Sequence, residues 1–334
     1  MRYCKSLNWA IVIVFLCVCP IMVYCGKKNN KQISLPSVPL PQVKSKCALY
    51  SPANNPVVPS TVIYAGEKVD FDRIDMYERL DRELTSLAYG HSNTLLTIKR
   101  ANRYFPVMIP ILKKYGIPED FIYLAAIESY FNVRAYSPAR AAGIWQFLAS
   151  TAKQYGLEVN DEVDERYDPE KSTVAACKYL KVGYSKYEHW ATVAASYNAG
   201  MGRISSELEK QLAENSFDLY LTDETSRYVF RIIAMKLIME TPKQYGFKLM
   251  KDQLYQDIKC KEITVNEAVP SWSDWAKNYG ISYMQLKEVN PWIRSRSLTN
   301  KDRKAYIVKI PLEKELYRSK RDFKTYNKNW TIEQ

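Results

Sequence analysis

The sequence predicts a mainly helical domain followed by a small domain whose elements run in the order β–α–α–β. Three observations lead to this fold class. Between residues 70 and 250, apolar side chains recur at helical spacing, and runs with strand-like alternation are few. After Cys260 the pattern changes to short strand-like and helix-like segments. A length of 334 residues with 47% apolar content allows two domains, each with its own core.

The N-terminal part of the chain is predicted to lie outside both domains. Basic residues precede an apolar run, Trp9–Tyr24, which is shorter than the roughly twenty residues that span a bilayer comfortably. We expect residues 1–26 to be a signal peptide or a membrane anchor, with lipidation of Cys25 as a further alternative. The protein would then be exported, and it would be periplasmic or membrane-associated in the cell envelope. Residues 27–69, rich in Pro, Ser and Asn, are predicted to be an extended linker.

Helices are predicted throughout residues 70–250. Apolar residues at helical spacing from Ile74 to Leu87 indicate the first. The second, around Ala101–Tyr115, contains Pro106 and Pro110 and is expected to be kinked or broken there. Pro118 is expected to open the third helix at its first position. Further helices are predicted at Ser150–Tyr155, Asp168–Tyr184, Trp190–Tyr197, Arg203–Glu214 and Thr222–Met239.

Residues 261–312 are predicted to form the small second domain, and residues 313–334 a basic tail. EITVNEA and KAYIVKIP are typical of strands, with two short helices between them. From Arg294 to Lys328 there are twelve Lys and Arg residues against four acidic ones. Such a segment can bind nucleic acid, anionic lipid or an acidic polymer, or can simply be solvated. Because no nucleic-acid-binding motif accompanies it, we expect no nucleic acid partner.

Histidine and cysteine chemistry is poorly supported. The chain has two histidines, and the cysteines outside the leader, Cys47, Cys177 and Cys260, form neither a metal-ligand spacing nor a disulfide framework. We therefore expect no metal and no cofactor, and carboxylate chemistry becomes the main option.

Glu128 is the first candidate for that chemistry. It ends a helix whose preceding turn is apolar, and burial would raise its pKa and keep it protonated near neutral pH. A protonated glutamic acid can give its proton to a glycosidic oxygen and later take one back. The alternative is a helix-end glutamate that faces solvent or pairs with Arg134 or Arg140.

Several further segments make Glu128 more than an isolated carboxylate. Ser137-Pro138 is typical of a helix N-cap, and Gly143 would let the backbone approach a ligand closely. Taken in order, five segments resemble the motifs of lytic transglycosylases with the soluble-transglycosylase (SLT) fold, and the resemblance covers roughly residues 70–250. These segments are ES at 128–129, SPARAAGIWQF at 137–147, DERYDP at 164–169, YNAG at 197–200 and ETSRYV at 224–229.

The resemblance implies a lysozyme-like helical fold and peptidoglycan glycan strands as the substrate. The β-1,4 bond between N-acetylmuramic acid and N-acetylglucosamine would be cleaved without water, leaving a 1,6-anhydromuramic acid end. Glu128 would be the sole catalytic acid and base, and Ser129 would orient it. Leu148-Ala149 stands where the family usually has Met-Pro. The remaining site residues implied are Ser137, Gln146, Tyr197, Asn198 and Tyr228.

Two other functions stay open at this point. One is a hydrolytic muramidase of lysozyme type, which needs a second carboxylate. Asp164, Glu165 and Asp168 are the candidates, although we interpret DERYDP as a loop in which Asp168 and Pro169 begin a helix. The other is a non-catalytic scaffold that binds peptidoglycan.

Residues 261–312 resemble a LysM module, a small carbohydrate-binding βααβ domain. WAKNYGISYMQLKEVNP and IVKIP carry this likeness. The Gly-Asp-Thr that usually follows the first strand is replaced by AVPSW, in a loop that normally helps to line the sugar groove. Glycan binding and a docking or structural role are therefore both open for this domain.

Overall fold

The structure, a computed structural model, describes residues 55–332. The signal peptide or anchor predicted for residues 1–26 lies outside the described residues. Within residues 55–332, no helix has both the length and the apolar character needed to cross a membrane.

The described chain begins with a β-hairpin that we expected to be linker. β1 (Thr61–Tyr64) pairs antiparallel with β2 (Glu67–Asp70). Every second side chain of β1 is buried in the helical core, and Gly66 has a positive φ of 86° in the turn. The linker prediction for residues 27–69 is therefore wrong over the hairpin, because four-residue strands are too short to give a clear alternating pattern.

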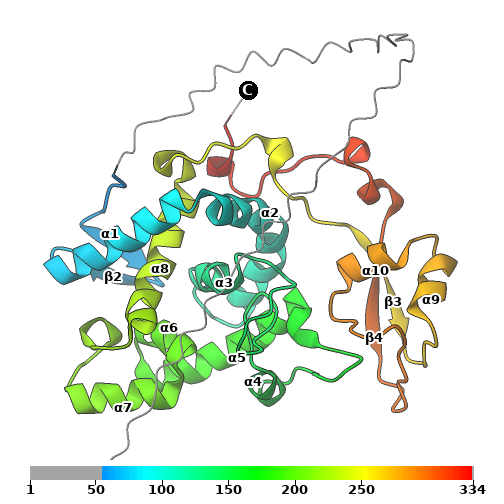
Figure 1. Ribbon diagram of the computed structural model, residues 1–334, viewed down its shortest axis with the longest axis horizontal. Helices are drawn as coiled ribbons and strands as arrows, with labels where there is room; N and C mark the ends of the chain where they lie inside the picture. Colours follow the sequence, from blue (N-terminus) through cyan, green and yellow to red (C-terminus); the bar gives the residue numbers. More distant parts are fainter. Residues whose placement is uncertain (1–54, 333–334) are drawn as a thin grey trace, which may run out of the picture. The chain divides into compact units, whose positions relative to one another are not determined.

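Eight helices of the described chain make up the rest of the first domain, and α3 lies among the others (Figure 1). α3 is buried on nearly all sides, which is typical of a helix at the centre of a core. The mainly helical fold class is thus confirmed. The helices are α1 (Ile74–Tyr89), α2 (His91–Lys114), α3 (Phe121–Ser129), α4 (Ala149–Gln154), α5 (Pro169–Tyr187), α6 (Trp190–Ala199), α7 (Met201–Gln211) and α8 (Asp223–Glu240).

Helix α2 was expected to be kinked or broken at its prolines, and the structure excludes the break. It begins at His91 and continues through Pro106 and Pro110. An interior proline costs about 3 kcal/mol of helix stability, since it removes a hydrogen bond and clashes with the preceding turn. The buried face of α2, which includes Phe105 and Met108, supplies tertiary packing that offsets this cost.

Helix α3 begins later than predicted. Pro118 lies in a turn before it, in which the Phe121 N–H donates to the Pro118 carbonyl at 3.1 Å. The Asp120 carboxylate does not cap the helix. It accepts from the N–H of Ala65 in the hairpin turn at 2.7 Å and pairs with Lys236 of α8 at 2.8 Å. Asp120 therefore joins three segments that are distant in sequence.

The βααβ order predicted for the second domain is confirmed. β3 (Cys260–Val265) pairs antiparallel with β4 (Tyr306–Pro311), with α9 (Trp272–Asn278) and α10 (Tyr283–Val289) between them (Figure 1). Ser271 caps α9 by accepting from the Asp274 N–H at 3.2 Å, as expected for a serine before a helix. The domain has its own core, separate from that of the helical domain.

The basic tail is exposed or half-buried over residues 313–329, but its end is anchored on the helical domain. After β4 the chain returns to the helical domain, where Thr331 forms a parallel bridge with Leu249. Trp330 is 1% exposed, and its indole N–H donates to the Met239 carbonyl at the end of α8 at 2.7 Å. The burial of Trp330 could not be predicted from the sequence, because a single tryptophan among many basic residues produces no periodic pattern.

Candidate active site

Glu128 lies in the last turn of α3, where the helix leaves the core. Burial raises the pKa of Glu128 to about 7, since few solvent molecules can stabilise its charged form, and the nearby charge of Glu224 raises it as well. A hydrogen bond from Tyr228 and the charge of Arg231 act in the opposite direction. The carboxyl group is therefore able to hold a proton and to release it near neutral pH.

Tyr228 is the direct partner of Glu128. It lies on α8, and its hydroxyl donates to Oε1 of Glu128. The ring is 3% exposed, and burial together with the adjacent carboxyl group raises the pKa of Tyr228 well above its usual value. This tyrosine thus remains a neutral hydrogen-bond donor at any physiological pH.

Tyr197 lies on α6 and faces the same site from another side. Its hydroxyl donates to the Trp145 carbonyl at 2.7 Å, so it holds the backbone of the segment that follows α3. Burial raises its pKa first, and the negative charge of Glu128 raises it further, which indicates that the two groups lie near each other. The structure therefore brings together Glu128, Tyr197 and Tyr228 from three helices.

Left-handed backbone conformations occur in the segment that follows Glu128. Tyr130 and Phe131, which end α3, both have a φ of 52°, and Gln146 has a φ of 49°. Such conformations are strained for residues with large side chains, and they cluster at functional sites of proteins. The side-chain N–H₂ of Gln146 donates to the Gly143 carbonyl at 2.8 Å, which folds the segment back on itself.

Ser129 does not contact the Glu128 carboxylate. Its side chain is buried, and its hydroxyl donates to the Ile144 carbonyl at 2.8 Å. The orienting role that the resemblance implied for Ser129 would therefore act through the backbone. In the structure Ser129 joins the end of α3 to the segment that carries Gln146.

Ser137 is in a tight turn and not at a helix N-cap. Its backbone N–H donates to the Ala141 carbonyl at 2.9 Å, and its hydroxyl accepts from the Ala141 N–H at 3.1 Å. Asn198 lies at the end of α6, where its side-chain carbonyl accepts from the Thr225 hydroxyl of α8 at 3.0 Å. Both side chains are half-buried, and both bind the protein itself here.

Gly143 is required by a protein contact and not by approach to a ligand. It has a φ of 79°, and a Cβ atom at this position would lie 1.8 Å from the Arg166 carbonyl oxygen. The segments SPARAAGIWQF and DERYDP are consequently packed backbone against backbone, and only glycine fits at the contact.

The carboxylates of DERYDP are all engaged away from Glu128. Asp164 pairs with Arg166 at 2.7 Å, Glu165 pairs with Lys171 at 2.5 Å, and Asp168 caps α5 by accepting from two backbone N–H groups. The interpretation of Asp168 and Pro169 as a helix start is confirmed. Among the described residues, the hydrogen bonds of Glu128 and Tyr228 involve no second carboxylate.

Two charged groups at the site were not singled out from the sequence. Glu224 and Arg231, both on α8, act on the pKa of Glu128 from a distance. Arg231 is itself paired, at 3.3 Å, with Glu83 of α1, a glutamate that is 1% exposed. Glu224 and Tyr228 are four residues apart on one helix, a spacing that places them on the same face and could have indicated this role.

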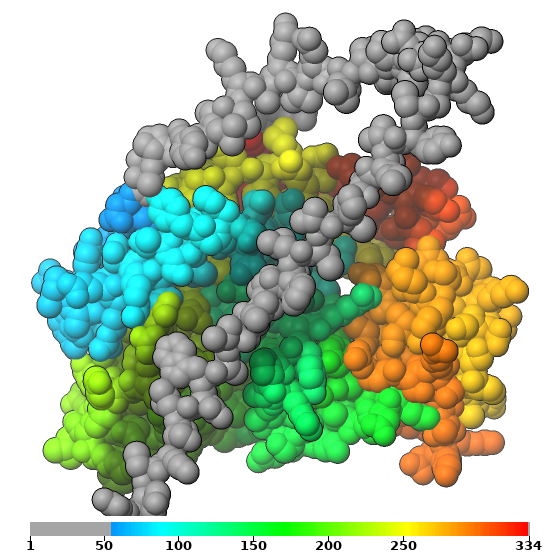
Figure 2. Space-filling model, in the orientation of Figure 1, coloured from blue at the N-terminus to red at the C-terminus, as the bar shows by residue number. Residues whose placement is uncertain are grey.

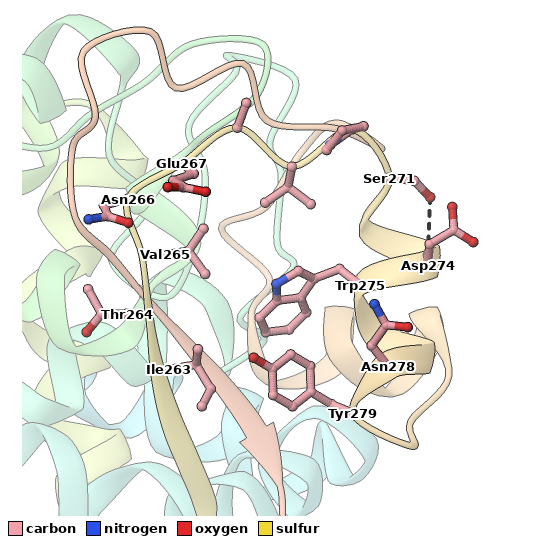
Figure 3. Close-up of a pocket in the computed structure, with 13 residues that line it drawn as sticks. Ile263, Thr264, Val265, Asn266, Glu267, Ser271, Asp274, Trp275, Asn278 and Tyr279 are labelled. Atoms are coloured by element: carbon pink, nitrogen blue, oxygen red, sulfur yellow. Dashed lines mark hydrogen bonds between the residues drawn. The ribbon is translucent and has the colours of Figure 1, made fainter.

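The second domain has a groove of about 430 Å³ between β3 and α9 (Figure 3). The rings of Trp275 and Tyr279 point from α9 toward Ile263 on the strand, and their centroids are 4.4 Å apart. Glu267 and Asn278 lie at its edge. The first four residues of the AVPSW segment, which departs from the usual LysM loop, also line this groove. Within residues 55–332, His, Cys, Asp and Glu side chains form no group of three that could hold a metal ion.

Comparison with known protein families agrees with these two domains. Residues 107–219 match the transglycosylase SLT domain, and residues 261–314 match the soluble lytic transglycosylase C-terminal LysM-like domain. The chain therefore carries an SLT domain and a LysM-like domain. The predicted fold class, a helical SLT domain followed by a small LysM-like domain, is confirmed by these matches.

Several proteins similar to this chain are lytic transglycosylases by name. The chain is homologous to membrane-bound lytic murein transglycosylase D of Escherichia coli K12, with 29% identity over 66% of this chain and 48% of the relative. Membrane-bound lytic murein transglycosylase C of Photorhabdus laumondii is 31% identical over 35% of this chain and 37% of its own. The solved 70 kDa soluble lytic transglycosylase of Escherichia coli has a TM-score of 0.36 and 21% identity, over 49% of this chain and 34% of that chain. The chain thus spans about half the length, or less, of these proteins.

Proposed function

We propose that the protein is a peptidoglycan lytic transglycosylase. It cleaves the β-1,4 bond between N-acetylmuramic acid and N-acetylglucosamine without water and leaves a 1,6-anhydromuramic acid end. The SLT match supports the family of reaction, and the names of the relatives supply the murein substrate. The observation that carries the proposal is the environment of Glu128, whose pKa of about 7 lets one group serve as acid and then as base.

In the first step, Glu128 protonates the glycosidic oxygen. Tyr228 donates to Oε1, so the acidic proton is on Oε2, the oxygen that remains free for the substrate. As the bond from C1 of muramic acid to the leaving oxygen breaks, that oxygen keeps its electron pair and takes the proton. Glu128 becomes a carboxylate, and the hydrogen bond from Tyr228 stabilises its charge.

In the second step, the muramic acid C6 hydroxyl attacks C1. Glu128 takes the proton of that hydroxyl, the bond from O6 to C1 closes the anhydro ring, and the acid is regenerated. The N-acetyl group of the substrate can stabilise the intermediate between the two steps. This route needs one protein carboxylate, whereas a retaining hydrolase needs a second one about 5 Å away and an inverting hydrolase a more distant one.

The alternatives are a hydrolytic muramidase and a non-catalytic scaffold. For a muramidase, Glu224 is the carboxylate to consider, because its charge acts on Glu128. It lies on an exposed position of α8. A scaffold would make no use of a protonated glutamic acid held by a buried tyrosine.

Digestion of purified sacculi separates these functions. Wild type is expected to release muropeptides whose masses are lower by one water than those of hydrolysis products, and Glu128→Gln is expected to release about 100-fold fewer or none. Glu207→Gln is the matched control, since Glu207 bonds only to Gln211 on the same helix. Products with reducing-end muramic acid would replace the proposal with a muramidase. Equal turnover by Glu128→Gln and wild type would exclude Glu128 as the catalyst.

We also propose that the groove of the LysM-like domain binds glycan. Trp275 and Tyr279 offer ring faces on which sugars can stack, and Glu267 and Asn278 offer hydrogen-bonding groups at the edge. Trp275→Ala should weaken binding to sacculi in a sedimentation assay. Unchanged sedimentation would leave the domain with a docking or structural role.

A location in the cell envelope follows from this substrate. The relatives are named membrane-bound lytic murein transglycosylases, and murein is an envelope polymer. Whether residues 1–26 provide a signal peptide, an anchor or a lipidated cysteine is decided by mass analysis of the protein isolated from membranes. Co-purification of the full-length protein from membranes would identify any protein partners.

A further inference from the structure

The LysM-like domain is joined to the helical domain by backbone hydrogen bonds. The Asp164 N–H donates to the Trp292 carbonyl at 2.9 Å, and the Arg294 N–H donates to the Glu162 carbonyl at 2.8 Å. Between these bonds Val163 is 1% exposed and belongs to the core of the LysM-like domain. A residue of one domain is therefore part of the core of the other.

Side chains on both sides of this junction strengthen it. Glu162 accepts from the N–H and the hydroxyl of Thr299, at 3.0 and 2.9 Å. Glu158 accepts from the Tyr306 hydroxyl at 3.0 Å and pairs with Lys304. In the space-filling view the orange surface of the LysM-like domain touches the green surface of the helical domain (Figure 2). We call residues 158–166 the junction loop.

The junction loop continues directly into the active-site segment through Arg166. The Arg166 guanidinium is buried and is held by Asp164 through hydrogen bonds of 2.9 and 2.7 Å. Its other end donates to the carbonyls of Arg140 and Phe147, at 2.9 and 3.0 Å. One arginine side chain thus holds both ends of residues 140–147, which contain no helix or strand.

Residues 140–147 in turn hold the catalytic surroundings. The Ile144 carbonyl accepts from Ser129, the neighbour of Glu128, and the Trp145 carbonyl accepts from Tyr197. Backbone bonds between Ala142 and Phe147 close this segment into a loop, but it has no helix or strand to fix its position. Its placement beside α3 therefore depends on the side chains that bind its carbonyls. A path of hydrogen bonds and short backbone segments therefore runs from the Trp292 carbonyl to Ser129, the neighbour of Glu128, and to Tyr197.

We propose that the LysM-like domain acts as a brace for the active site, with Glu158 and Glu162 as positioning residues and Arg166 as the link. This inference rests on the proposed function of Glu128. Neither glutamate touches the glycan; each fixes the junction loop, and the loop fixes residues 140–147. The C-terminal tail makes a second connection from the LysM-like domain to the helical domain, since the Tyr326 N–H donates to Oδ1 of Asn102 of α2 at 2.8 Å.

The test is the full-length double variant Glu158→Ala/Glu162→Ala. Both side chains are half-buried at the junction, so their removal leaves each core intact. On a short soluble glycan of alternating N-acetylglucosamine and N-acetylmuramic acid, kcat is expected to fall about 10- to 100-fold with a smaller change in KM, as expected when a reacting group is misplaced. Such a substrate can reach Glu128 without requiring the groove of Trp275 and Tyr279.

Lys309→Met is the matched control. Lys309 also forms an ion pair between the two domains, but its partner is Glu170 in the first turn of α5 and not the junction loop. Its removal is expected to leave kcat unchanged. If wild type turns over the glycan and the double variant has the same kcat, the brace is overturned and the proposed function stands. A wild type that is no more active than Glu128→Gln would overturn the proposed function and the brace with it.

Hydrogen exchange gives a second readout that does not need activity. In the double variant the amides of residues 140–147 are expected to exchange at least several-fold faster, while those of α8 keep their wild-type rates. A general loss of stability would instead raise exchange in both places. Unchanged exchange in residues 140–147 would overturn the brace even if kcat were lower.

Discussion

Replacing Glu128 by glutamine is expected to stabilise the protein at alkaline pH. Burial raises the pKa of Glu128 from 4.5 to about 7, so the folded protein binds the proton more tightly than the unfolded chain does. The stabilisation from this proton is fully present below the unfolded pKa and is lost as pH rises through the folded pKa. Glutamine stays neutral at every pH and can still accept from Tyr228.

The size of the effect follows from the two pKa values. Each unit of difference corresponds to about 1.4 kcal/mol, so wild type loses about 3 kcal/mol relative to the variant between pH 4.5 and pH 8. In a domain of this size, that difference raises the Tm of Glu128→Gln by roughly 5–10 °C over wild type at pH 8. Near pH 4.5 the gap should be small.

The assay is thermal unfolding of wild type, Glu128→Gln and Glu207→Gln from pH 4.5 to pH 8.5. Glu207 is the control because it lies on the surface helix α7, bonded to Gln211. A Tm gap between wild type and Glu128→Gln that is the same at both ends of the pH range would refute the inference that Glu128 is protonated in the folded protein. So would a gap of equal size for Glu207→Gln.

Three further outcomes are expected. Tyr228→Phe removes a hydrogen bond that lowers the pKa of Glu128, so the alkaline limb of the pH–rate profile should move to higher pH and kcat should fall about 3- to 10-fold. Glu224→Gln removes a negative charge that raises that pKa, so the limb should move to lower pH while the anhydro product persists; loss of turnover would instead assign Glu224 a hydrolytic role. Trp330→Ala should lower the free energy of unfolding by about 3–5 kcal/mol in urea titrations, and a loss below 1 kcal/mol would show that the tail contributes little to the core.

The helices could be predicted because their evidence is local. A buried helix face repeats about every 3.6 residues, and the bounds of α5, α6 and α8 agree with their predicted ranges within a few residues. The hairpin before α1 was missed because its strands are too short for a period to emerge. The continuity of α2 through Pro106 and Pro110 depends on tertiary packing, which local rules do not include.

The candidate site could be predicted in its residues but not in its contacts. Glu128 and Tyr228 are one hundred residues apart. No pattern within α3 or α8 shows that the Tyr228 hydroxyl binds the Glu128 carboxyl group. Ser129 was expected to orient Glu128 and Ser137 to contact the glycan; in the structure both hydroxyl groups bond to backbone groups of the chain. Every residue has a backbone carbonyl, so the sequence does not indicate which carbonyl a given side chain will bind.

The position of Trp330 affects how the protein is made. Its indole is buried against α8, ninety-one positions after its acceptor Met239, so this part of the helical core cannot be filled until the LysM-like domain has also been synthesised. The contact is therefore long in sequence, and it makes completion of the first domain a late event in folding. A fragment cut at residue 250 would expose the hollow that the indole fills, and exchange of the LysM-like domain between relatives would need to carry residue 330 along with it.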